Sequence, residues 1–245
     1  MPRPTLIAFD CFGTIVRNEE SEWTATLTAI AETQGLDIPG PELRAQWSQR
    51  EQNFRKTRTN MADPANSPPF RTYWEAWRDA FVETFAALNL PGDAEAAATR
   101  CVEDQRSRKA FADTDPALAA LKGRIPLAIM SNADDRFLFG SLEFNGWSFD
   151  PVISSEAAKA YKPDPRAFDA LCKAAGVEAH QVLYVGDSAY DDAHGAKLAG
   201  MRTVLIRRDQ NTPGRTPPPD AATLIEPDHE INLLTELPAL LDTLN

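Results

Sequence analysis

Aspartate residues follow apolar runs at two distant places in the chain. This pattern is typical of an active site built from carboxylates. Asp10 ends the apolar run Leu6–Phe9, and a glycine, Gly13, follows closely. Asp187 and Asp192 follow a second apolar run near the other end of the chain. A carboxylate can attack an electrophilic centre and form an ester or acyl phosphate, which water then hydrolyses. We therefore predict that Asp10 is a catalytic nucleophile.

Three further polar residues stand beside predicted helices and strands in a similar way. Ser131 and Asn132 follow the apolar run Ile125–Met130, and Lys162 lies in a loop just before a predicted helix. In open parallel sheets, ligands bind outside the carboxyl ends of the strands, so groups that follow strands meet at one edge. Ser131 and Thr14 can donate hydrogen bonds to an anionic substrate, and Lys162 supplies a positive charge. Alone, each would be interpreted as a turn or surface residue, and their shared position is what indicates chemistry.

Three aspartates in one site repel one another. Two charges about 4 Å apart cost roughly 4 kcal/mol at an effective dielectric near 20, so Asp10, Asp187 and Asp192 require a compensating cation. Mg²⁺ prefers oxygen ligands of this kind, and we predict it as the cofactor. The chain has only 3 histidines and 3 widely separated cysteines, which argues against a histidine-based metal site or triad, a disulfide framework and a zinc site.

Strands that alternate with helices must position these residues. Short apolar runs predict strands at residues 6–9, 125–130, 152–153, 182–185 and 203–206. Between and after them the pattern predicts helices, at 116–122, after Asp134, at 165–175, up to Ala199 and at 231–241. Proline-rich residues 209–219 predict an exposed loop. Such alternation is typical of an α/β fold with a parallel sheet covered on both faces.

The residues between the first two strands predict helices alone. Helical periodicity begins after Asn18, a candidate N-cap, and begins again after Pro41, from Trp74 and from Ala94. Residues 61–69 interrupt it as a loop rich in proline. Most of the aromatic residues at helical spacing are expected to pack inside this unit. We therefore predict two domains. One is a helical cap, residues 17–109, and it is inserted into the other, a core made of residues 1–16 and 110–245.

The composition argues against nucleic acid and membranes as partners. The formal net charge is −11, and lysine and arginine are scattered along the chain, so the field of the protein opposes polyanions and anionic membranes. No apolar run approaches the roughly 18 residues that span a bilayer, and Asp10 comes too early for a signal-peptide core. We expect a cytoplasmic monomer or homodimer that acts on a small anionic substrate.

Four segments resemble the motifs of the haloacid dehalogenase (HAD) superfamily of hydrolases, in the subfamily with a helical cap. The first is FDCFGT, which contains Asp10, and the second is Ser131-Asn132. The third is YKPDP, which contains Lys162, and the fourth is GDSAYDDAHGAKLAG, which begins at Gly186. The motifs occur in the superfamily's order, and the resemblance covers essentially the whole chain.

This resemblance implies a Rossmann-like core and a role for each motif. Asp10 would form an aspartyl-enzyme intermediate, and Ser131 and Asn132 would contact an oxyanion or phosphate. Lys162 would stabilise the site. Where Mg²⁺ is bound, the implied ligands are the carboxylates of Asp10, Asp187 or Asp192 and the backbone carbonyl of Phe12.

Phe12 stands where two chemistries within the superfamily divide. The phosphatases of the superfamily resemble one another in carrying a second aspartate at this position, which protonates the leaving alcohol. A general acid of this kind typically raises the rate roughly 10²–10⁴-fold. An aromatic residue instead resembles the 2-haloacid dehalogenases, whose halide leaving group needs no proton. Those dehalogenases also resemble one another in a metal-free SSNxWD fourth motif and in an arginine after a cap tryptophan. Here the fourth motif is GDSAYDD and Ser48 stands after Trp47, although Arg50, on the same helical face, can substitute.

Three hypotheses follow from these motifs. The first is a Mg²⁺-dependent hydrolase of a small phosphorylated metabolite, motivated by Asp187 and Asp192 and refuted if a chelator leaves turnover unchanged. The alternative is a 2-haloacid dehalogenase, motivated by FDCFGT and tested by halide release from 2-chloropropionate without added metal. A catalytically weak binding protein of the same fold is the third, and turnover lost in Asp10→Asn would exclude it. In each case Phe12, Trp47 and Arg50 are the candidate substrate contacts.

Overall fold

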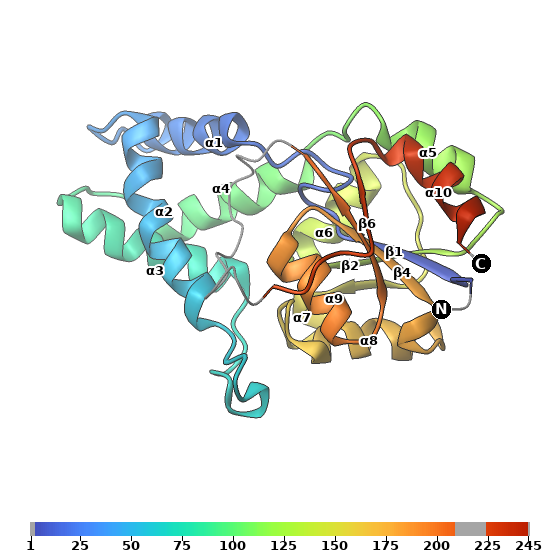
Figure 1. Ribbon diagram of the computed structural model, residues 1–245. Coiled ribbons are helices and arrows are strands. Elements are labelled where there is room, and N and C mark those ends of the chain that lie inside the picture. Colours follow the sequence, from blue (N-terminus) through green and yellow to red (C-terminus); the bar gives the residue numbers. More distant parts are fainter. Residues whose placement is uncertain (1–2, 209–223, 245) are drawn as a thin grey trace.

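Six parallel strands form the sheet of the computed structural model, which describes residues 3–208 and 224–244. Their order is β3-β2-β1-β4-β5-β6, so the chain runs outward from β1 in one direction and then from β4 in the other (Figure 1). The strands are β1 (Leu6–Phe9), β2 (Leu127–Ser131), β3 (Val152–Ser154), β4 (Val182–Gly186), β5 (Arg202–Ile206) and β6 (His229–Ile231). The strand order reverses between β1 and β4, which is where open α/β sheets bind ligands.

The central strands are buried on both faces, as their continuous apolar runs predict. In β1, Ile7 and Phe9 pack into one hydrophobic cluster, while Leu6 and Ala8 pack into another on the opposite face. The first face is covered by α5 (Thr114–Leu121), α6 (Asp135–Phe144) and α10 (Leu237–Thr243), and the second by α8 (Pro165–Ala175) and α9 (Gly195–Leu198). The short α7 (Ser155–Ala158) follows β3. The sheet is therefore the middle layer of a Rossmann-like α/β core.

Four helices between β1 and β2 form the cap, which lies to one side of the sheet (Figure 1). They are α1 (Glu20–Thr33), α2 (Gly40–Thr57), α3 (Tyr73–Leu88) and α4 (Ala94–Arg106), and all lie within the residues 17–109 predicted for it. Aromatic rings fill its interior: Trp47 stacks on Trp23 at 5.4 Å and on Phe81 at 5.3 Å between ring centroids. Rings at helical spacing thus pack mainly against one another.

A residue of the core completes the N-terminus of a cap helix. The first turn of α3 leaves backbone N–H groups that need partners. Asp134, in the loop after β2, accepts hydrogen bonds from the backbone nitrogens of Tyr73 at 2.7 Å and Trp74 at 2.8 Å. The side chain of Thr72 accepts from the nitrogen of Glu75 at 3.2 Å. Cap and core are therefore joined by hydrogen bonds as well as by the chain.

Three expectations about local structure were wrong. Glu19, and not Asn18, is the N-cap of α1, because the Asn18 side chain accepts a hydrogen bond from Trp23 Nε1 at 2.9 Å. Residues 229–231 form the edge strand β6, in which only Ile231 is buried, and the predicted helix 231–241 begins only at Leu237. A short 3₁₀ helix, Pro64–Asn66, lies in the loop 61–69.

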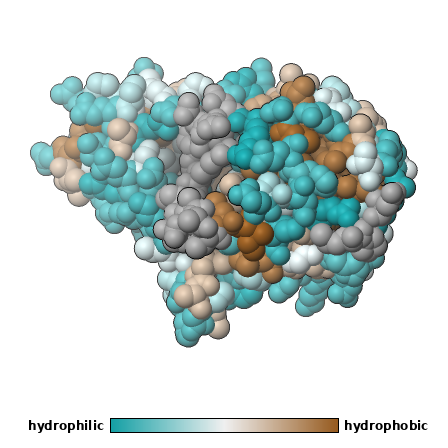
Figure 2. All heavy atoms as spheres, viewed as in Figure 1, coloured by the Kyte–Doolittle hydropathy of each residue, from teal (hydrophilic) through white to brown (hydrophobic). Residues whose placement is uncertain are grey.

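The predicted loop at 209–219 lies outside the described residues. In the part of the chain that the structure describes, no helix combines the length and apolar character needed to cross a bilayer. The face in Figure 2 is mostly hydrophilic, with separate hydrophobic patches.

Candidate active site

Lys162 is the centre of a hydrogen-bond network at the carboxyl edge of the sheet. Its side chain is almost completely buried, and its Nζ donates to Asp10 Oδ1 at 2.7 Å and to Asp192 Oδ1 at 2.5 Å. It also donates to the hydroxyl of Tyr184 at 2.7 Å, which itself donates to the backbone oxygen of Met130 at 2.6 Å. The structure thus brings together the first, third and fourth motifs, which lie far apart in the sequence.

Two hydroxyl groups hold the carboxylate of Asp10 from its other sides. Ser131 Oγ donates to Asp10 Oδ1 at 2.9 Å. Thr14 Oγ1 lies 3.3 Å from Asp10 Oδ2 and 3.2 Å from Asp187 Oδ1. Oδ1 of Asp10 therefore accepts two short hydrogen bonds, while Oδ2 has one long contact.

Asn132 contacts the backbone of Lys162. Its Nδ2 donates to the carbonyl oxygen of Lys162 at 3.0 Å, and its Oδ1 accepts from the Lys162 nitrogen at 2.8 Å. Both ends of the amide are thus engaged in holding the loop that carries Lys162. Asn132 also lines the cavity, and its predicted contact with a substrate oxyanion stays a prediction.

Tyr184 was missed by the sequence analysis. It lies inside the buried strand β4, where the sequence shows only an apolar run, and its hydroxyl joins Lys162 to the backbone of β2. A buried hydroxyl needs a hydrogen-bond partner, so a tyrosine within such a run is the one signal that could have indicated it.

Burial and charge pairing set the ionisation of Asp10, the predicted nucleophile. Burial raises the pKa of Asp10 to about 6, an effect that the nearby Lys162 opposes and Asp192 reinforces. Burial alone would lower the pKa of Lys162, but Asp10 and Asp192 hold it well above its usual value. At neutral pH the site therefore contains ionised Asp10 beside a charged lysine.

Three carboxylates of the site lie close enough to share a cation. One oxygen each of Asp10, Asp187 and Asp192 lies within 4.8 Å of the others, and all three residues are buried. Gly13 allows this approach, because its φ is +97° and a Cβ there would lie 2.7 Å from Asp187 Oδ2. An all-oxygen cluster fits a hard cation such as Mg²⁺. The predicted contribution of the Phe12 carbonyl stays a prediction.

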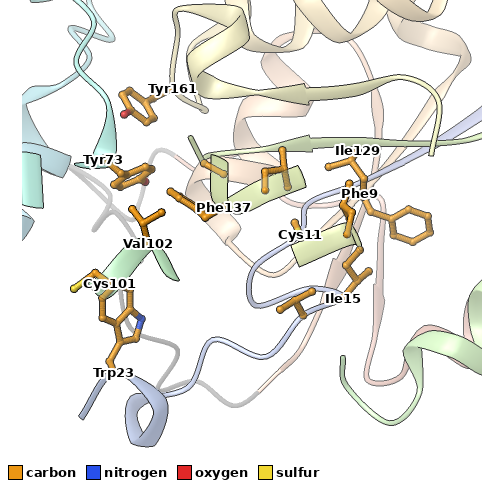
Figure 3. Packing of buried hydrophobic residues seen from close by; sticks show 14 of the residues in the cluster. Phe9, Cys11, Ile15, Trp23, Tyr73, Cys101, Val102, Ile129, Phe137 and Tyr161 are labelled. Atoms are coloured by element: carbon orange, nitrogen blue, oxygen red, sulfur yellow. The ribbon is translucent and has the colours of Figure 1, made fainter. Parts of the chain in front are cut away.

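A small cavity of about 70 Å³ opens above these residues, between core and cap. The core contributes Asp10, Ser131, Lys162 and the aspartates of the fourth motif, and Phe12 also lines it. Phe12 packs against Phe137 at 5.4 Å between ring centroids. From the cap the cavity is lined by Asn18, Trp23, Arg55, Tyr73, Trp77 and Gln105. Figure 3 shows Tyr73 and Phe137 beside one another where cap and core meet.

Trp47 and Arg50, predicted as substrate contacts, do not line this cavity. Trp47 is buried in the aromatic interior of the cap. Arg50 turns toward α3, with its Nε 3.8 Å from Glu83, and donates to the backbone oxygen of Gln46 at 2.9 Å. The cap arginine that does line the cavity is Arg55, one and a half turns further along α2.

Arg55 is held in place by two neighbours. Its Nε donates to Glu51 Oε1 at 2.6 Å, and its Nη1 donates to the hydroxyl of Tyr73 at 2.9 Å. Burial alone would lower the pKa of Arg55, but Glu51 raises it above the usual value, so the guanidinium is charged. Its remaining nitrogen, Nη2, makes no hydrogen bond to a described residue.

Asp191, which precedes Asp192 in the fourth motif, is buried. Its Oδ2 lies 3.6 Å from Nη2 of Arg58, which ends α2. Arg58 also lies over the ring of Tyr161 and donates to the hydroxyl of Tyr73 at 2.6 Å. This contact between cap and core depends on how α2 meets the fourth motif, which the sequence pattern does not show.

Comparisons with known proteins agree with this arrangement. The family model for haloacid dehalogenase-like hydrolases matches residues 4–200. (S)-2-haloacid dehalogenase 1 of Pseudomonas sp. (strain CBS-3) is 29% identical over 241 residues, which cover 95% of this chain and 94% of that protein. The (S)-2-haloacid dehalogenase of Pseudomonas sp. (strain YL) is 31% identical over 185 residues, 73% of this chain and 76% of that protein.

Among solved structures, a crystal structure of an L-2-haloacid dehalogenase superposes with a TM-score of 0.76 at 27% identity and covers 98% of this chain and 99% of that one. The chain belongs to the family of haloacid dehalogenase-like hydrolases, enzymes whose four motifs it carries in order.

Proposed function

We propose that the protein hydrolyses the carbon–halogen bond of a short 2-haloalkanoate. The observation that carries this proposal is Phe12, whose ring packs against Phe137 at the position where a phosphatase needs a proton donor. A halide leaves without a proton, so its displacement is compatible with an aromatic side chain there. The relatives named above are 2-haloacid dehalogenases, which supports the same chemistry.

The hydrogen bonds of Asp10 suggest how each carboxylate oxygen takes part. Oδ2, with one long contact, would attack C2 of the substrate and form an ester bond while the carbon–halogen bond breaks and the halide leaves with the electron pair. Water would then add to the ester carbonyl carbon. Oδ1 would carry the developing negative charge, which Lys162 and Ser131 are placed to stabilise. Release of the 2-hydroxyalkanoate and a proton regenerates Asp10.

Arg55 supports the assignment of an anionic substrate. Among the described residues that line the cavity, the lysine and arginine side chains are those of Lys162 and Arg55. Lys162 is paired with Asp10 and Asp192, whereas Nη2 of Arg55 makes no hydrogen bond to a described residue. We infer that Arg55 receives the substrate carboxylate, the role that the sequence suggested for Arg50.

A second candidate, metal-dependent hydrolysis of a small phosphorylated metabolite, is favoured by the cluster of Asp10, Asp187 and Asp192. A divalent cation held there would neutralise the charge of a phosphate. The carboxylates of the fourth motif predicted this candidate first, whereas the relatives favour the dehalogenase instead. Phe12 also weighs against it, because it stands where a phosphatase has the acid that protonates the leaving group.

One pair of assays separates the two candidates. Chloride release from 2-chloropropionate in the presence of EDTA, abolished in Asp10→Asn, is the expected result for the dehalogenase. Phosphate release from acetyl phosphate that requires Mg²⁺, without chloride release from the haloacid, would overturn the proposal and support the second candidate. Turnover of neither compound would also count against the proposal.

A further inference from the structure

Two polar groups on the cap side of the cavity are buried without hydrogen-bond partners. Trp77, in α3, is 2% exposed, and its Nε1 bonds to no described residue. Gln105, near the end of α4, is 3% exposed, and its Oε1 is likewise unpaired. No hydrogen bond joins the rest of its amide to the described part of the chain either. Such groups are uncommon in native proteins and costly unless a ligand satisfies them.

The neighbouring polar groups on the same side already have partners. The side-chain oxygen of Asn18 accepts hydrogen bonds from Trp23 Nε1 and from Arg108. The hydroxyl of Tyr73 accepts from Arg55 and Arg58 at 2.9 and 2.6 Å. Among the described residues that line the cavity from the cap, Trp77 Nε1 and Gln105 Oε1 are the buried polar atoms without a hydrogen-bond partner.

We propose that Trp77 and Gln105 form a subsite for a hydroxyl group on the tail of the substrate, so that the preferred substrate is a hydroxylated organic acid. A hydroxyl can accept a hydrogen bond from the indole N–H and donate one to the amide oxygen. Trp77, Gln105 and Asp10 all line the same cavity, so one small molecule can reach both this subsite and Asp10. That the other end is a 2-haloalkanoate rests on the proposed function.

The chemistry of the pair favours a hydroxyl over the alternatives. An alkyl tail would leave both groups unsatisfied, and a site built to bond a hydroxyl discriminates strongly against the analogue that lacks it. A carboxylate would place negative charge against the oxygen of Gln105.

The test is a comparison of binding that requires no turnover. Calorimetry on the full-length protein measures the affinities of 4-hydroxybutanoate and of pentanoate, which differ by a hydroxyl in place of a methyl group. We expect the hydroxylated acid to bind roughly tenfold more tightly, the value of one to two net hydrogen bonds. The same pair of acids is then measured with Trp77→Phe and with Gln105→Met.

Each of these variants should bring the affinity ratio close to one, since one removes the donor and the other the acceptor. Trp74→Phe is the matched control, because Trp74 lies in the same helix, donates its Nε1 to Thr99 Oγ1 at 3.1 Å and does not line the cavity. That variant should keep the wild-type ratio. Gln105→Met keeps the test valid if Trp77→Phe disturbs the stacking of its ring on Phe137.

Equal affinities for the two acids in the wild-type protein, no binding of either, or a ratio unchanged in both variants would overturn the subsite. Chloride release from 2-chloropropionate is measured on the same preparations. A tenfold ratio without chloride release would support the subsite and refute the proposed reaction, so the two failures are distinguishable.

Discussion

The two walls of the cavity differ in how completely their polar groups are satisfied. On the sheet side, Lys162 bonds to four groups, and Asp10 accepts hydrogen bonds at both oxygens. On the cap side, Arg55, Trp77 and Gln105 each keep a nitrogen or oxygen without a hydrogen bond to a described residue. A wall whose groups are already bonded is preorganised for reaction. Under the proposed function, the sheet side supplies the reacting groups and the cap side selects the substrate.

The largest effect should come from removing the lysine at the centre of the hydrogen-bond network on the sheet side of the cavity. Lys162→Met leaves two buried carboxylates, Asp10 and Asp192, without their shared cation. We expect kcat to fall roughly 10²–10³-fold and the free energy of unfolding to fall by roughly 3–5 kcal/mol, measured by halide release and urea denaturation. Lys197→Met, which removes a more exposed pair with Asp228 at 2.7 Å, should cost less than about 1 kcal/mol. Equal effects of the two variants would contradict this assignment.

A smaller effect, confined to substrate affinity, should follow from changing the cap wall. Arg55→Met removes the cation proposed for the substrate carboxylate, so KM should rise roughly 10–100-fold, the value of a charge-assisted hydrogen bond. Arg50→Met is the matched control in the same helix, and its KM should stay at the wild-type value. Steady-state kinetics with 2-chloropropionate measure both. If Arg50→Met raised KM more than Arg55→Met does, the substrate carboxylate would not bind at Arg55.

The smallest effect should be that of pH on kcat/KM, through the ionisation of Asp10 on the sheet side of the cavity. Because the pKa of Asp10 is raised to about 6, kcat/KM should fall to roughly one tenth of its plateau at pH 5. Arg55→Met should keep the same midpoint. A midpoint near pH 4 in the wild-type enzyme would show that burial does not control Asp10.

The same ionisation has the opposite consequence for stability. Burial raises the pKa of Asp10 above its unfolded value, so its contribution to stability is present below about pH 4 and lost as pH rises through 6. Asp10→Asn should therefore gain stability relative to the wild type over that interval.

The sequence predicted the sheet wall far better than the cap wall. Asp10, Ser131 and Lys162 follow strands or precede a helix, and parallel strands necessarily bring such positions to one edge. Arg50 and Arg55 lie on the same helix, and which of them faces the cavity depends on how α2 packs against α3. No periodicity in one helix contains that information.

Two other misses have related causes. The strand β6 has a single buried residue, Ile231, so it lacks the apolar run that indicates a strand. Asp191 is buried beside Arg58, which is distant in sequence and close only after the cap has folded against the core. Both features depend on tertiary contacts, which override local preference.

The hydrogen bonds from Tyr73 and Trp74 to Asp134 have a consequence for motion. If the cap lifts from the sheet at α3, these two backbone amides lose their partners and become exposed to water. Their exchange with deuterium would then report each opening of the cavity, separately from the global unfolding of the cap. A substrate that spans both walls would slow that exchange, which gives a measure of closure that does not depend on turnover.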